Sequence, residues 1–110
     1  MSIPSHITFA DDRLEKEFHT LASGDDRERV LYITLLRAFQ AVEKDAFAGT
    51  QLAERLIPKT YGRYRITNLW KYDLVDGWRL LYTIEGHEIV VLSIILEWLD
   101  HKEYERRLKY

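Results

Sequence analysis

The fold is decided by residues 65–96, which read RITNLWKYDLVDGWRLLYTIEGHEIVVLSIIL. Three runs in this stretch are rich in β-branched and aromatic side chains, at about 65–74, 78–84 and 87–96. Asp76-Gly77 and Glu85-Gly86 separate the runs, and such pairs favour tight turns between antiparallel strands. The stretch therefore predicts two hairpins in series, which form an antiparallel meander.

Side chains alternate along the middle run. Trp78, Leu80, Tyr82 and Ile84 point to one face of the sheet, and Arg79, Leu81 and Thr83 point to the other. If helices cover the Trp78 face, Arg79 projects into the opposite concavity, where Lys71 from the neighbouring strand can join it. The last run, from Ile89 to Leu96, is apolar on both faces, which favours a strand that is covered on both sides.

The preceding residues carry the pattern of a short strand followed by two helices. Ile7 and Phe9 predict the strand, and Asp11 or Asp12 can cap a helix in which Leu14, Phe18 and Leu21 recur at helical spacing. Ser23-Gly24 ends this helix. Asp25 and Glu28 form a capping-box pattern that begins a longer helix at about 25–48, which Gly49 ends.

Shorter elements complete the chain. Residues 51–56 predict a further helical turn that Pro58 ends, and Asp100 begins a short terminal helix. The element order β-α-α-β-β-β-α predicts an α+β fold, in which an N-terminal strand and a helical hairpin pack on a small twisted antiparallel sheet. With 110 residues, we expect a single domain over 1–110.

Composition excludes several classes of site. The chain has 46% hydrophobic residues and a net charge of -2, so it can bury a core but has no overall positive field. The absence of cysteine excludes disulfides, cysteine-ligated zinc and a thiol nucleophile. The four histidines lack metal-ligand spacing and the five glycines form no phosphate loop, so we expect neither metal nor cofactor. The charged first twenty residues and the lack of a long apolar run predict a cytoplasmic protein without a membrane segment.

Basic and aromatic residues are interleaved between positions 59 and 79: Lys59, Tyr61, Arg63, Tyr64, Arg65, Trp70, Lys71 and Arg79. Basic side chains neutralise phosphates and aromatic rings stack on bases, so this pattern predicts a single-stranded nucleic-acid footprint with Lys59, Arg63 and Arg65 as RNA contacts. The alternative is an ordinary solvated strand surface. Arginine, lysine, histidine and tyrosine together can also cleave a phosphodiester without a metal, by proton transfer and guanidinium stabilisation of the transition state.

The stretch Trp70–Tyr82, the run Ile89–Leu92 and the closing segment with Tyr104 resemble the RelE/ParE toxin superfamily. The most specific part is Gly77-Trp78-Arg79-Leu80-Leu81-Tyr82, which is similar to that family's Gly-aromatic-Arg-Leu-aliphatic-Tyr strand. The resemblance implies the toxin of a toxin–antitoxin pair, which in the RelE branch cleaves mRNA in the ribosomal A site.

The resemblance also implies roles for four residues. Arg79 matches the arginine that stabilises the scissile phosphate, Lys71 matches a basic residue of the preceding strand, His101 is the candidate acid, and Tyr104 matches a C-terminal tyrosine. The implied partners are the ribosome with its mRNA and a cognate antitoxin. The antitoxin helix would cover the apolar flank of the sheet or displace the terminal helix, with Trp98 and Leu99 as docking residues unless both close the core.

The chain also departs from the RelE pattern. Asp73 stands where RelE-like enzymes often have a second lysine, and Glu97-Trp98-Leu99-Asp100 stands near a basic cluster of some members. Both changes remove positive charge. The alternative is therefore a ParE-like or degenerate member that acts by binding a protein such as DNA gyrase. Arg79 could instead form an ion pair with Asp73 or Asp76, and Tyr104 could pack the terminal helix on the sheet. The sequence leaves the oligomeric state open.

Overall fold

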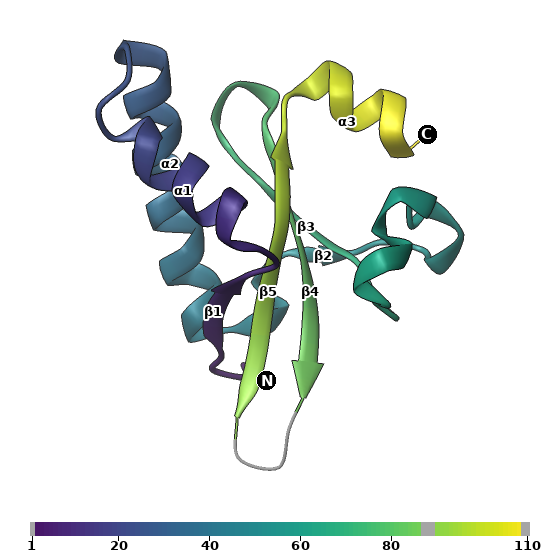
Figure 1. Ribbon diagram of the computed structural model, residues 1–110. Coiled ribbons are helices and arrows are strands. Elements are labelled where there is room, and N and C mark those ends of the chain that lie inside the picture. Colours follow the sequence, from purple (N-terminus) through teal and green to yellow (C-terminus); the bar gives the residue numbers. More distant parts are fainter. Residues whose placement is uncertain (1, 87–89, 109–110) are drawn as a thin grey trace.

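A five-stranded sheet organises the fold (Figure 1). The structure is a computed structural model that describes residues 2–86 and 90–108. The strands are β1 (His6–Phe9), β2 (Thr50–Gln51), β3 (Trp70–Asp73), β4 (Arg79–Gly86) and β5 (Val91–Leu99), in the spatial order β1-β5-β4-β3-β2. The predicted meander is confirmed, since β3, β4 and β5 pair antiparallel.

The predicted small antiparallel sheet is part of a larger mixed sheet, because β1 pairs parallel with β5. The apolar pattern of a short strand sets which face is buried but not its direction. The two helices that follow β1 carry the chain away from it, and β5 returns later to lie beside it (Figure 1). The architecture is therefore α+β with a mixed sheet.

Capping residues set where the helices begin. Asp11 caps α1 (Asp12–Leu21) by accepting from the Leu14 amide at 2.8 Å. The expected capping box begins α2 (Asp26–Lys44), since the Asp25 carboxylate accepts from the Glu28 amide and the Glu28 carboxylate from the Asp25 amide. Asp100 likewise accepts from the Glu103 amide at 2.9 Å, at the start of α3 (His101–Leu108).

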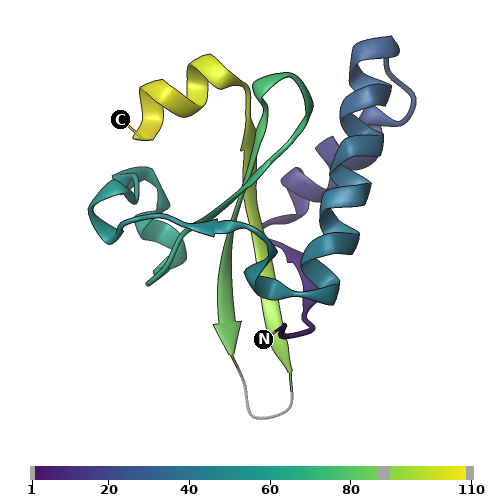
Figure 2. The same ribbon diagram turned by 180° about the vertical axis from the view of Figure 1, so that it is seen from behind.

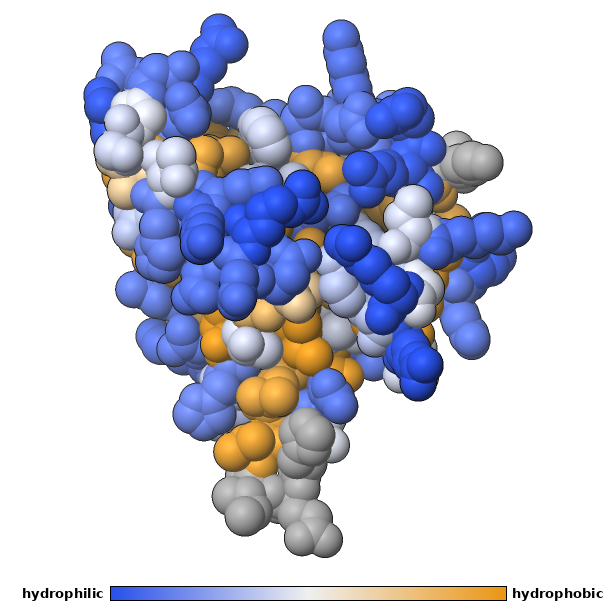
Figure 3. All heavy atoms as spheres, in the orientation of Figure 1, coloured by the Kyte–Doolittle hydropathy of each residue, from blue (hydrophilic) through white to orange (hydrophobic). Residues whose placement is uncertain are grey.

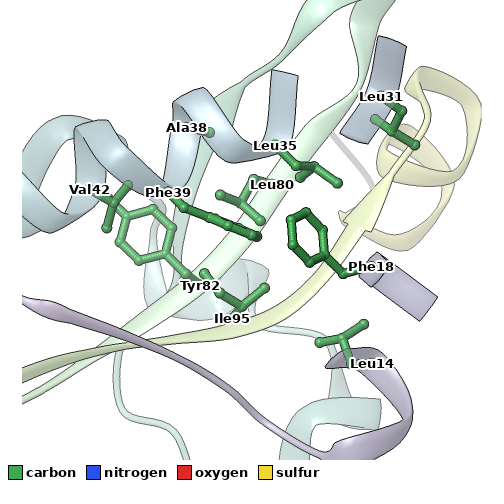
Figure 4. Packing of buried hydrophobic residues seen from close by; sticks show 10 residues of the cluster. All are labelled: Leu14, Phe18, Leu31, Leu35, Ala38, Phe39, Val42, Leu80, Tyr82 and Ile95. Atoms are coloured by element: carbon green, nitrogen blue, oxygen red, sulfur yellow. The ribbon is translucent and has the colours of Figure 1, made fainter. Parts of the chain in front are cut away.

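The main core lies between α1, α2 and one face of the sheet (Figure 4). Leu80 and Tyr82 of β4 and Ile95 of β5 are fully buried there, which confirms the expected alternation along β4. The helices contribute Leu14, Phe18, Leu31, Leu35, Ala38, Phe39 and Val42. Figure 2 shows α2 lying along this side of the sheet.

A second, smaller core covers the opposite face, where the sequence suggests an open concavity. Its buried residues are Leu52, Tyr61, Leu69, Leu81, Leu96, Leu99, Tyr104 and Leu108. They come from α3, from the strands and from the segment that contains the 3-10 helices η2 (Glu54–Leu56) and η3 (Lys59–Tyr64). Residues on this face of the sheet that carry chemistry are therefore partly enclosed.

Several predicted boundaries are wrong. The helix expected at 25–48 ends at Lys44, and a separate 3-10 helix, η1 (Ala46–Ala48), follows. Asp45 causes this break, because its extended backbone ends α2 while its side chain accepts from the Phe47 amide. In the expected turn at 51–56 only η2 is helical, and the first strand of the meander begins at Trp70 rather than near Arg65. The last run begins partly outside the described residues and continues to Leu99.

The turn before β4 forms as expected. Asp76 and Gly77 both have positive φ angles, 55° and 78°, within η4 (Val75–Gly77). Figure 3 shows a contrast between the two ends of the molecule: hydrophobic residues reach the surface near the β4–β5 connection, whereas the end that carries α3 is mainly hydrophilic. None of the helices in the described residues is both long and apolar enough to cross a membrane.

Candidate functional site

Strand pairing places Lys71 and Arg79 on one face of the sheet. Lys71 pairs with Leu81, and Asp73 pairs with Arg79, so all four side chains lie on the face opposite α1 and α2. The expectation that Lys71 joins Arg79 on this face is confirmed.

Asp73 lies between these two cations. One of its carboxylate oxygens, Oδ1, is 3.1 Å from Lys71 Nζ and 2.9 Å from Arg79 Nε. The Arg79 and Lys71 side chains are only 20% and 21% exposed, whereas the Asp73 side chain is 61% exposed. The ion pair of Arg79 with Asp73 that the sequence left open is therefore present, and it takes up part of the positive charge of the site.

The β3–β4 turn fixes the Arg79 guanidinium. Nη1 donates to the Gly77 carbonyl at 2.7 Å and to the Trp78 carbonyl at 3.3 Å. Nε is buried and makes no hydrogen bond, so its contact with Asp73 is an ion pair without a well-directed N–H. These contacts give the guanidinium one orientation before any ligand arrives.

Helix α3 brings the remaining two candidates to the same place. The Arg79 guanidinium carbon lies 5.3 Å from the centre of the Tyr104 ring, a cation–π distance. His101 packs against Gly77 so closely that a Cβ on Gly77 would lie 3.0 Å from the His101 Cβ. The structure thus gathers Arg79, Lys71, His101 and Tyr104 around the β3–β4 turn. We call these four residues and Asp73 the Arg79 cluster.

The two residues from α3 differ in access. Tyr104 is only 3% exposed and belongs to the second core, so its packing role is present. The His101 side chain is 57% exposed, and its Nε2 lies 3.0 Å from Glu105 Oε1. Of the two residues from α3, His101 is therefore the accessible one, and imidazole is a side chain that can transfer protons.

The predicted RNA contacts do not join this cluster. The Arg63 guanidinium lies over the Tyr64 ring at 4.7 Å, donates to the Tyr64 hydroxyl and is 3.8 Å from Asp11 Oδ2. Arg65 is exposed, with a left-handed backbone (φ 53°) at the end of η3. Lys59 lines a cleft beside the end of α3. The three residues thus lie along the η3 segment and not with Arg79.

Sequence reasoning missed a polar group next to η3. Glu97 of β5 and Arg107 of α3 form an ion pair at 2.6 Å, at a hollow of about 450 Å³ that Tyr61 and Arg63 also line. The Tyr61 hydroxyl is buried without a hydrogen bond; burial first, and then nearby Glu97, raise the Tyr61 pKa above its ordinary value. These residues are far apart in the sequence and share no motif that could have revealed them.

A largely apolar groove of about 740 Å³ lies between α2, the β3–β4 turn and the end of β5. Val30 and Val75 are 50% and 42% exposed there, and Trp78 and Trp98 are half-buried. Leu99, which the sequence offered as a docking residue, is only 8% exposed and closes the second core. Trp98 therefore keeps an accessible face, whereas Leu99 does not.

The part of the chain that the structure describes contains no group of three or more histidine or carboxylate side chains placed to hold a metal ion. Comparisons with protein-family models, with curated proteins and with solved structures give no match to this chain. Inferences about its function therefore depend on the residues themselves and on the resemblance described above.

Proposed function

We propose that the protein is the toxin of a toxin–antitoxin pair, a RelE-like endoribonuclease that cleaves mRNA on the ribosome without a metal. The observation that supports this most is the gathering of Arg79, Lys71 and His101 from β4, β3 and α3 around one turn. Two cations can stabilise the charge of the transition state and an accessible imidazole can transfer a proton, which are two contributions to RNA cleavage through the 2′-hydroxyl.

In the proposed reaction, the 2′-hydroxyl of the RNA gives its proton to a water molecule, and its oxygen attacks the adjacent phosphorus. The bond from phosphorus to the 5′-oxygen then breaks, which gives a 2′,3′-cyclic phosphate and a 5′-hydroxyl. Arg79 and Lys71 stabilise the extra negative charge of the phosphorane, and protonated His101 donates its proton to the leaving 5′-oxygen. Glu105 holds the imidazole through Nε2, which leaves Nδ1 as the donor.

Asp73 competes with the phosphate for the same cations. Because the Asp73 side chain is 61% exposed, a phosphate that contacts Arg79 and Lys71 can displace its carboxylate from both cations. Replacing Asp73 with asparagine removes one negative charge at almost constant shape. We expect Asp73→Asn to cleave faster than the natural protein at low substrate concentration.

The direct test is cell-free translation of a reporter mRNA with purified protein, in which primer extension maps the new 5′ ends. Arg79→Ala should abolish the cuts, and Asp73→Asn should increase them. Arg37→Ala, on the exposed side of α2, serves as the control for lost positive charge. Circular dichroism checks that each variant folds. Unchanged cleavage by Arg79→Ala would refute the role given to Arg79, and intact mRNA with the natural protein would refute the nuclease proposal.

The pairing of both cations with Asp73 favours a second candidate, a ParE-like protein that inhibits DNA gyrase by binding. Such a protein needs no phosphate site, and the ion pairs would then only join β3 to β4 and support the turn. In that case the purified chain should inhibit gyrase supercoiling, and Asp73→Asn should leave translation unchanged. Supercoiling at the normal rate would exclude this candidate.

For the cognate antitoxin, we propose the groove that contains Val30, Val75 and Trp98 as the docking surface. Four of its lining residues are acidic (Asp26, Glu28, Asp76 and Asp100) and Arg27 alone is basic. The groove therefore suits an amphipathic segment with basic residues beside its apolar face. Displacement of α3 is less favourable, because it would expose Tyr104 and Leu108, which are 3% and 2% exposed. Val30→Glu with Val75→Glu should abolish binding of the antitoxin and leave toxicity intact.

A further inference from the structure

A second cationic site lies beside the C-terminal end of α3. The residues from Arg55 to Thr60 and those from Arg106 to Leu108 line a cleft of about 600 Å³. Four of them, Arg55, Lys59, Arg106 and Arg107, are cations, and none of the described residues that line the cleft is a carboxylate. Its two walls come from the end of α3 and from the segment with η2 and η3, and Figure 1 shows both segments on the same side of the sheet.

The four cations differ in their partners. Arg106 contacts Glu103 at 2.6 Å and Arg107 contacts Glu97 at 2.6 Å, so these two are held in position and partly neutralised. Arg55 and Lys59 are exposed and form no ion pair within the described residues. The cleft therefore keeps a net positive charge, even though the whole chain carries -2.

The remaining residues that line the cleft are mainly apolar, which suits a ligand larger than a simple ion. Leu56, Ile57 and Pro58 are half-buried and form an apolar wall together with Leu108. An apolar wall between cations lowers the local dielectric constant, which strengthens their attraction for an anion. It also offers a surface for the sugar and base of a nucleotide, whose phosphates the cations contact.

Helix α3 joins this cleft to the Arg79 cluster. His101 and Tyr104 at its start contact the β3–β4 turn and Arg79, whereas Arg106 and Arg107 line the cleft. With a rise of about 1.5 Å per residue, five or six helical positions correspond to about 8 to 9 Å. An extended single strand can therefore reach both sites at once.

We infer that the cleft between Arg55 and Arg107 binds the phosphate backbone of single-stranded RNA and holds a strand that extends from the Arg79 cluster. The choice of RNA among polyanions rests on the proposed nuclease function, whereas the anion site itself does not. The cleft supplies affinity and does not take part in the cleavage step.

The test measures RNA binding without the ribosome, by fluorescence anisotropy of a labelled oligouridine at several salt concentrations. The variant is Arg55→Ala with Lys59→Ala, and both of these side chains are exposed. Each phosphate contact to a single strand contributes about 0.7 to the slope of log affinity against log salt, so the slope should fall by about 1.4. If the two proteins bind alike near 1 M salt, the variant should bind about 25-fold more weakly near 0.1 M.

The matched control is Arg37→Ala with Lys44→Ala, which removes the same charge from exposed positions of α2. This control variant should keep most of the natural protein's slope of log affinity against log salt. Equal losses in the two double variants, or no measurable binding by the natural protein near 0.05 M salt, would overturn the inference. The translation assay separates the two proposals: if the natural protein leaves the mRNA intact, the nuclease proposal fails, and the oligouridine measurement still tests whether the cleft binds a polyanion.

Discussion

The Tyr82 hydroxyl connects the centre of the sheet to the segment after α2, and we expect its removal to be costly. It donates to the Ala46 carbonyl at 2.7 Å and accepts from the Gly49 amide at 3.0 Å. Tyr82 and Ala46 are both fully buried. Tyr82→Phe keeps the ring and its apolar packing, so the change isolates the hydroxyl.

The loss of stability comes from the two backbone groups that lose their hydrogen-bond partner. The Ala46 carbonyl would be buried without a partner, which costs about 1 to 3 kcal/mol. The Gly49 amide is only part-buried and can bond to water, so it adds less. We expect Tyr82→Phe to lower the free energy of unfolding by about 2 kcal/mol near pH 8.

High pH should reduce the difference in free energy of unfolding between the natural protein and Tyr82→Phe. Burial raises the pKa of Tyr82 to about 12, although the hydrogen bond from Gly49 lowers it slightly. An unfolded tyrosine has a pKa of about 10, so between these two values only the unfolded chain loses the proton. The natural protein therefore loses about 1.4 kcal/mol of stability for each pH unit in that window, and the phenylalanine variant does not.

Urea denaturation, followed by circular dichroism near pH 8 and near pH 11, measures both effects. The difference in free energy of unfolding between the two proteins should narrow from about 2 kcal/mol near pH 8 to under 1 kcal/mol near pH 11. The slope of this free energy against urea concentration should stay the same. Tyr61 is common to both proteins, so its own ionisation cancels. A gap below about 0.5 kcal/mol near pH 8, or one that does not narrow, would refute this account of the hydroxyl.

Three further predictions concern stability. Asp25→Ala should lower the free energy of unfolding by about 1 kcal/mol in thermal melts. Asp25→Asn should keep most of the stability that the cap provides, because asparagine also caps helices. Gly49→Ala should destabilise by about 1 to 3 kcal/mol and shift the amide NMR signals of β2 and β3, because its Cβ would lie 2.3 Å from the Lys71 carbonyl oxygen. The amide of Leu14 holds the pKa of Asp11 below its ordinary value, so the stability from Asp11 is present above the ordinary carboxyl pKa and is lost as pH falls through the lowered one. Acid unfolding should accordingly be shallower in Asp11→Ala, and an unchanged pH profile would contradict this.

Local patterns predicted the parts of the fold that neighbouring residues determine. The capping box at Asp25, the turn at Asp76-Gly77 and the alternation along β4 each depend on a few adjacent side chains. A polar cap, a glycine that accepts a positive φ and a period of two residues act in the same way in any protein.

Features set by distant residues could not be predicted in this way. The parallel pairing of β1 with β5 joins segments more than eighty positions apart, and β2 forms only because Thr50 and Gln51 reach the edge of β3. The second core likewise depends on where the η3 segment folds back onto the sheet. None of these contacts leaves a periodic signal in the segments that make them.

The candidate site shows the same division. Alternation along the strands placed Lys71 and Arg79 on one face, and the position of α3 brings His101 to the turn before β4. The division of the basic residues between two sites could not be foreseen, because it depends on the path of η3. Arg55, Arg106 and Arg107 stand outside the interleaved pattern of the sequence and so were missed.

The two sites together also bear on how an acidic protein could hold RNA. In the Arg79 cluster, Asp73 offsets one of two cations, so the cluster alone gives weak attraction but a fixed guanidinium. In the cleft, Arg55 and Lys59 form no ion pair within the described residues, but they belong to no cluster of side chains that can transfer a proton. Affinity would then come mainly from the cleft and phosphate positioning from the cluster. This division accounts for a net charge of -2 without requiring the loss of activity, since electrostatic attraction of a strand depends on the charges within about a Debye length of it.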